Sequence, residues 1–119
     1  MSIPDEFELL SLFECEPTLL DRDVPFFYNK ATYEFINSVN ERFIVSICPS
    51  YSDIKIQVYS ADNNELLSVF DFIKVDAIFI ISDKREESKI EIRTEVGVVC
   101  INFKPRFKVY LSYANSELL

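Results

Sequence analysis

Apolar and polar residues alternate along most of the chain after Glu41, which is the pattern of half-buried β-strands. The clearest case is Asp53 to Tyr59, in which Ile54, Ile56 and Val58 alternate with polar side chains. Other segments with strand character are Phe43 to Cys48, Leu66 to Phe72, Ala77 to Ser82, Lys89 to Arg93, Val98 to Phe103 and Phe107 to Ser112. Short strands separated by turns predict a mainly β fold, an antiparallel meander that forms a sandwich or a partly open barrel.

The beginning of the chain instead predicts a short N-terminal helix. Pro4 suits the first turn of a helix, and the acidic residues that follow it suit the positive end of the helix dipole. Apolar residues then recur at helical spacing, at Phe7, Leu10 and Phe13. These three residues form the apolar stripe of the expected helix, which Pro17 ends.

Three further segments have less regular patterns. Tyr33 to Ser38 contains aromatic and β-branched residues, which favour a strand, although a helix is also compatible with the pattern. The aromatic cluster Phe26-Phe27-Tyr28 is of a kind found more often in a core than at an interface. The last residues, Asn115 to Leu119, are expected to fray.

Length and composition indicate one β-rich domain over residues 1–119. Hydrophobic residues make up 49% of the chain, which is enough for a core, and a single glycine leaves no flexible linker. The three cysteines are too widely spaced for a disulfide framework, and Cys48 and Cys100 lie in apolar segments that predict burial. Reduced thiols and a start without a secretory signal predict a cytoplasmic protein that does not enter a membrane.

The negative charge is concentrated at the start of the chain. The net charge is −8, and residues 1–29 contain seven acidic residues but one basic residue. A surface of this kind repels nucleic acid and anionic lipid and attracts basic partners. The alternative is that the acids only keep the protein soluble.

The residue types that most enzymes use are scarce. The chain has no histidine, which excludes Ser-His-Asp and Cys-His catalysis and the usual zinc enzymes, and one glycine excludes a phosphate-binding loop. Two carboxylate pairs, Glu14 with Glu16 and Asp21 with Asp23, have the composition of a glycosidase pair. They lie in a turn-rich segment without an apolar pocket to raise one pKa, so we expect no enzyme activity, no cofactor and no metal.

Six residues are the candidates for binding a partner. Four are the acids Glu14, Glu16, Asp21 and Asp23, and two are the tyrosines Tyr59 and Tyr110, which alternation places on the outside of strands. The alternative for the aspartates is turn formation around Arg22, and for the tyrosines a cross-strand pair that supports the sheet.

The chain resembles a class of small bacterial proteins. The stretch from Glu16 to Asn29, EPTLLDRDVPFFYN, followed by a β-rich acidic body, looks like small bacterial proteins. In size, charge and lack of catalytic motif, the whole chain resembles the immunity proteins of contact-dependent and other polymorphic toxin systems. This resemblance implies a cytoplasmic inhibitor that binds one cognate protein toxin, commonly a nuclease, and blocks its active site or its substrate surface.

The sequence leaves two points open, which are the oligomeric state and an alternative function. Sheet edges allow either a monomer or a homodimer formed by edge pairing. The alternative function is a small β-barrel or sandwich that carries an apolar ligand, or a structural adaptor, because the many phenylalanines would also suit the lining of a cavity.

Overall fold

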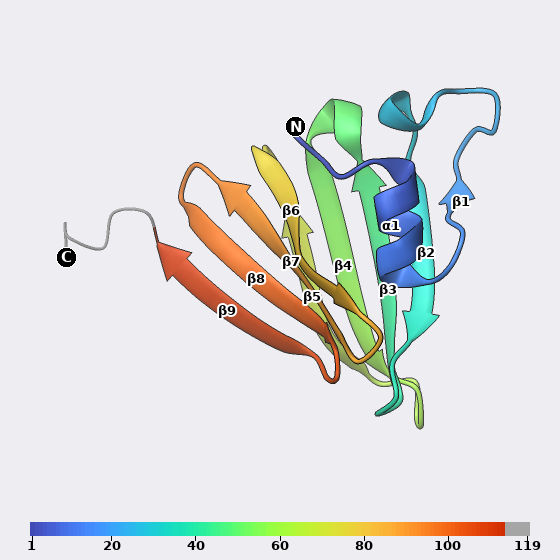
Figure 1. Cartoon of the computed structure of the whole chain (residues 1–119), viewed down its shortest axis with the longest axis vertical. Coiled ribbons are helices and arrows are strands. Elements are labelled where there is room, and N and C mark those ends of the chain that lie inside the picture. Colours follow the sequence, from blue (N-terminus) through green and yellow to red (C-terminus); the bar gives the residue numbers. More distant parts are fainter. Residues whose placement is uncertain (114–119) are drawn as a thin grey trace.

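The computed structural model describes residues 1–113, so the expected fraying of Asn115 to Leu119 concerns a part of the chain outside the described residues. Two antiparallel sheets make up most of the fold (Figure 1). The first has the strand order β1 (Thr18–Leu19), β2 (Ala31–Ile36), β3 (Glu41–Cys48), β4 (Asp53–Ser60) and β5 (Leu66–Phe72). The second has the order β6 (Ala77–Lys84), β7 (Glu87–Thr94), β8 (Gly97–Lys104) and β9 (Lys108–Tyr113). The helical elements are α1 (Glu6–Phe13) and the 3-10 turns η1 (Phe26–Tyr28) and η2 (Pro49–Tyr51).

The predicted mainly β, antiparallel fold with a short N-terminal helix is confirmed. Each strand in a sheet pairs with its neighbour in the sequence. Short turns connect most of these pairs, whereas β1 and β2 are joined by a longer loop that contains η1. Within the described residues, the two sheets pack face to face and do not close into a barrel, so the fold is a sandwich.

The core lies between the sheets and follows the alternation in the sequence. On the first sheet, Val45 pairs with Ile56 and both side chains are fully buried. On the second sheet, Ile90 and Ile101 are partners and are equally buried. Polar neighbours on the same strands face outward, as a period of two residues requires.

Aromatic rings fill the end of the core beneath α1. The ring of Phe13 lies 4.7 Å from that of Tyr33 and 5.5 Å from that of Phe103, measured between centroids. The Phe43 ring lies 5.2 Å from both Phe35 and Phe103. These rings come from α1, β2, β3 and β8, so the cluster joins the helix and both sheets.

The buried face of α1 differs from the predicted stripe. The residues that enter the core are Leu9, Leu12 and Phe13, whereas Phe7 is 81% exposed and Leu10 is 37% exposed. Both stripes have helical spacing, and contacts outside the helix select between them. The chain before α1 pairs with β6, since Ser2 forms a parallel bridge to Ala77, and this attachment fixes how the helix is rotated.

The two segments with irregular sequence patterns, Tyr33 to Ser38 and Phe26 to Tyr28, form different kinds of element. Tyr33 to Ile36 belongs to strand β2, so the strand alternative is correct. The aromatic cluster forms the 3-10 turn η1, in which Phe26 packs against the core while Phe27 and Tyr28 are 44% and 68% exposed. The expectation of a core cluster is therefore wrong for two of the three rings, because a tight turn directs successive side chains to different sides.

A polar clamp joins the two sheets at the β2–β3 turn. The Asn37 side chain, 5% exposed, donates hydrogen bonds to the Phe103 carbonyl and to Glu41 Oε1, both at 2.9 Å. The same Glu41 oxygen accepts a hydrogen bond of 2.8 Å from the Phe107 backbone N–H. These contacts hold the β8–β9 turn against the first sheet.

The edges of the two sheets differ in how far other elements cover them. The β6 edge is covered by the Ser2 bridge and by α1, whose Ser11 Oγ donates a hydrogen bond of 2.6 Å to Asp83 Oδ2. The β1 edge is two residues long. In the part of the chain that the structure describes, β5 and β9 have a neighbouring strand on one side alone. None of the described helices is long and apolar enough to cross a membrane.

Candidate interaction surface

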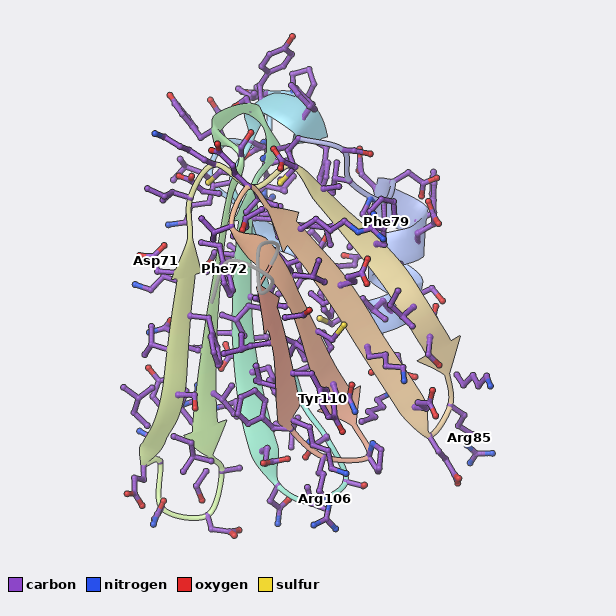
Figure 2. All side chains as sticks on the ribbon, turned by 90° about the vertical axis from the view of Figure 1, so that its left-hand side faces the viewer. Asp71, Phe72, Phe79, Arg85, Arg106 and Tyr110 are labelled. Atoms are coloured by element: carbon purple, nitrogen blue, oxygen red, sulfur yellow. The ribbon has the colours of Figure 1, made fainter. Side chains whose placement is uncertain are left out.

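The acids of residues 1–29 all lie on the surface formed by α1, β1 and the loop before η1. We call this surface the acidic face. It consists of Asp5, Glu6, Glu8, Glu14, Glu16, Asp21 and Asp23, all exposed. The second sheet has the opposite balance, with seven basic and five acidic residues between Ala77 and Tyr113. Figure 2 shows Arg85 and Arg106 at hairpin ends of that sheet. Residues 30–76 contain seven acidic and four basic residues, so the net negative charge is greatest in residues 1–29 and is absent from the second sheet.

Two of these acids have a structural role at the start of α1. Asp5 caps the helix, because its side chain accepts a hydrogen bond of 2.9 Å from the Glu8 backbone N–H. Glu8 returns the interaction by accepting a bond of 3.1 Å from the Asp5 N–H. This capping box fixes where the helix begins and so places Glu6 and Phe7 on its exposed side.

Glu14 and Glu16 follow the end of the helix. Glu14 adopts a left-handed conformation with φ of 56°, which ends α1, and its carboxylate lies 3.0 Å from Lys104 Nζ. This pair is largely exposed on the glutamate side, so its contribution to stability is small. Glu16 is exposed and lines a groove beside α1. Of these two candidates, Glu14 is in an ion pair, and no ion pair of Glu16 is found among the described residues.

Asp21 and Asp23 lie in a loop that the buried Asn29 organises. The Asn29 side chain donates to the carbonyls of Asp21 and Val24 and accepts from the N–H groups of Asp21 and Lys30. Asp21 Oδ1 in turn accepts a hydrogen bond of 3.0 Å from the Asp23 N–H. Asp21 therefore has the turn-forming role considered for it. Asp23 is an exposed residue of the loop that Asp21 helps to shape.

Replacing Asn29 with alanine should unfold this loop and destabilise the protein by about 2 kcal/mol, because buried backbone groups lose their partners. Urea denaturation would measure the loss, and faster amide exchange at Asp21 and Val24 would locate it. The exposed Asn63→Ala change serves as a control with little expected effect. Unchanged exchange in the loop would contradict this role of Asn29.

Large apolar side chains lie exposed among these acids. Phe7 is 81% exposed, Leu20 79% and Tyr28 68%. An apolar centre surrounded by charged residues is typical of protein–protein interfaces, and aromatic residues are enriched there. The sequence analysis places Phe7 in a helical stripe and Tyr28 in a core cluster, and so it does not identify these anchors. The signal that could identify Phe7 is an apolar residue directly between two acids, as in Glu6-Phe7-Glu8.

A groove of about 250 Å³ lies within this surface, between α1 and the β1–η1 segment. Its apolar lining comes from Phe7, Leu10, Pro17, Leu19 and Phe26. Its polar lining comes from Glu6, Glu16 and Tyr33. We call it the α1–η1 groove.

The two candidate tyrosines lie apart from the acidic face and from each other. Tyr59 is on the outer side of the first sheet, where the Arg42 guanidinium lies 4.6 Å from the ring centroid. Tyr110 is on the outer side of the second sheet, beside Cys100, and is 57% exposed (Figure 2). The two rings therefore belong to different sheets.

A second hollow of about 350 Å³ opens between β5, the β7–β8 turn and β9. Phe72 and Leu111 contribute to its apolar lining, and Figure 2 shows Phe72 on β5 at this side of the sandwich. It is a groove at the open edge between the sheets. A carrier of apolar ligands would enclose its ligand in a cavity, whereas this hollow is open to solvent along the sheet edge.

The groups with chemical reactivity are few and dispersed. The described residues contain no cluster of three or more metal-binding side chains. All three cysteines are free and partly buried, so the expected full burial of Cys48 and Cys100 is only partly correct. Burial raises the pKa of the Cys15 and Cys48 thiols, which favours the unreactive protonated form. The four candidate carboxylates are exposed, without the desolvation that a general acid requires.

Comparison with known proteins identifies a solved structure whose fold is similar to that of this chain. No protein-family model and no curated protein sequence matches the chain. Among solved structures, the chain is similar to one in a complex from Klebsiella pneumoniae 342, described as a contact-dependent growth inhibition toxin – immunity protein complex. The TM-score is 0.68, the sequence identity is 24%, and the match covers 93% of this chain and 95% of the other. The two chains therefore share a fold over nearly their whole length.

Proposed function

We propose that this protein is an immunity protein, which binds and neutralises a cognate bacterial toxin domain through its acidic face. The single observation that carries the proposal is the shared fold with a chain of a toxin–immunity complex, over nearly the whole of both chains. Of the two roles in such a complex, the inhibitor fits this chain. It has no histidine and a single glycine, whereas an inhibitor requires only a surface complementary to its target.

The acidic face has the properties that such binding needs. Its acids are exposed and gathered on adjoining elements, so their field attracts a basic surface during diffusion. Exposed Phe7, Leu20 and Tyr28 supply apolar area that a partner would bury. A standard interface covers about 800 Å² on each partner, which a face of this kind can provide.

A nuclease is the toxin type that suits this surface best. A nuclease attracts a polyanionic substrate and therefore carries a basic cleft. An acidic inhibitor can occupy that cleft and exclude the substrate by both charge and volume. The inhibitor would act in the cytoplasm, where such a substrate is found, and would need neither cofactor nor catalytic residue.

This function predicts a toxin gene beside the gene of this protein, and the test is complex formation with the toxin domain that such a gene encodes. We expect a 1:1 complex on gel filtration, loss of toxin activity, and survival of cells that express both proteins. Stopped-flow measurements should show association at least about tenfold slower in 0.5 M than in 0.05 M salt, because exposed charges are screened. A toxin that remains fully active with excess inhibitor would refute the proposal.

A further inference from the structure

The α1–η1 groove has an unusual combination of lining groups. Its walls are apolar, and the charged side chains that line it are two carboxylates, Glu6 and Glu16. No basic residue of the described chain lines it. A hollow with apolar walls and negative groups favours a cationic ligand with an aliphatic stem.

A tyrosine of the core also reaches this groove. Tyr33 is 1% exposed and lines the groove, so its side chain belongs to the groove wall. The ring packs against Phe13, at 4.7 Å between centroids, and this contact fixes its position there. The Tyr33 hydroxyl is therefore a third polar group available to a ligand in the groove, beside the two carboxylates.

The surroundings of the Tyr33 hydroxyl favour its protonated form. Burial raises the pKa of Tyr33 above its usual range, and the nearby Cys15 and Glu6 add to the effect. The phenol therefore stays neutral near pH 7. Its oxygen retains lone pairs that can accept a hydrogen bond from a cationic N–H group.

We infer that the α1–η1 groove binds an arginine side chain of the partner protein, and this inference rests on the proposed function. Three acceptors, the Glu6 and Glu16 carboxylates and the Tyr33 hydroxyl, line the same groove. A guanidinium presents five N–H donors in a fixed plane and can serve several acceptors at once, whereas an ammonium is a compact point charge. The methylene stem packs on Leu10, Leu19 and Phe26, and the planar head suits the face of an aromatic ring.

The first test uses a small probe, so that it does not depend on the toxin. The blocked peptide acetyl-Gly-Arg-Gly-amide is titrated into ¹⁵N-labelled protein and followed by NMR. We expect shifts centred on Leu10, Leu19 and Tyr33, and at least about tenfold weaker binding of the matching citrulline peptide, which has the same shape without the charge. Equal binding of both peptides, or shifts centred elsewhere, would overturn the inference.

The second test uses a triple variant, Glu6→Gln, Glu16→Gln and Tyr33→Phe, which keeps the volume of each side chain. We expect at least about tenfold weaker peptide binding and at least about tenfold faster dissociation of the toxin complex. The matched control, Glu8→Gln with Asp23→Asn, changes two acids of the same face that do not line the groove. It should leave peptide binding unchanged.

The outcomes separate the two proposals. If the toxin binds the wild type but dissociates from the triple variant at an unchanged rate, the groove inference is wrong and the immunity function stands. If the arginine peptide binds in the groove but the neighbouring toxin is not inhibited, the function is wrong and the groove remains an arginine site.

Discussion

Replacing Phe43 with alanine should lower the free energy of unfolding by about 4 kcal/mol, which is the usual cost of deleting a fully buried aromatic ring. Phe43 has no exposed surface, and its ring contacts those of Phe35 and Phe103 at 5.2 Å and of Phe107 at 6.1 Å between centroids. Phe35 and Phe103 lie on different sheets. The substitution therefore removes a contact across the sandwich, and the cavity cannot be filled by moving one strand alone.

Chemical denaturation would measure this loss against a matched control, Phe7→Ala. The Phe7 ring is 81% exposed, so its removal should change the free energy of unfolding by less than about 0.5 kcal/mol. Should Phe43→Ala fail to fold, the milder Phe43→Leu should fold with a smaller loss. Equal effects at the two phenylalanines would mean that the ring cluster is not the centre of the core.

Reversing the charge of the acidic face should have the largest effect on partner binding. The variant with Glu6, Glu16 and Asp23 all changed to lysine should associate with the toxin domain at least about 100-fold more slowly, because attraction becomes repulsion. These three changes leave the Glu14 ion pair intact, and the Asp21 turn uses the backbone N–H of Asp23 and not its side chain, so the fold should be kept. Stopped-flow fluorescence in 0.05 M salt would measure the rate.

The control variant changes Glu65, Glu86 and Glu95 to lysine. It alters the net charge equally, but its three positions lie in turns between strands outside the acidic face. We expect a decrease in association rate of less than about tenfold, since charges far from the contact act through a screened field. If the two variants slow association alike, net charge rather than the acidic face governs binding.

The strands were predictable because each is a local pattern. In β4, Ile54, Ile56 and Val58 alternate with polar residues, and a period of two residues is sufficient to separate the buried from the exposed side. The same logic failed for α1, where two stripes have helical spacing. The pairing of Ser2 with Ala77 selects one of them, and this contact is distant in the sequence.

The candidate site was predictable only in part, because it joins residues from several elements. Glu16 was identified from local charge, and it lines the groove. Glu6 and Tyr33 come from α1 and β2 and meet Glu16 only after folding. Alternation correctly placed Tyr59 and Tyr110 on outer faces, but it cannot show that these faces belong to different sheets.

The N-terminal segment has a second consequence, because it carries the acidic face and also covers the margin of the second sheet. The bridge from Ser2 and the Ser11–Asp83 hydrogen bond attach this segment to β6. A protein that binds α1 would therefore also hold β6 in place, without contacting β6 itself. Partner binding and protection of the β6 edge from strand-by-strand aggregation would then be linked, and the protein would resist unfolding most while a partner is bound.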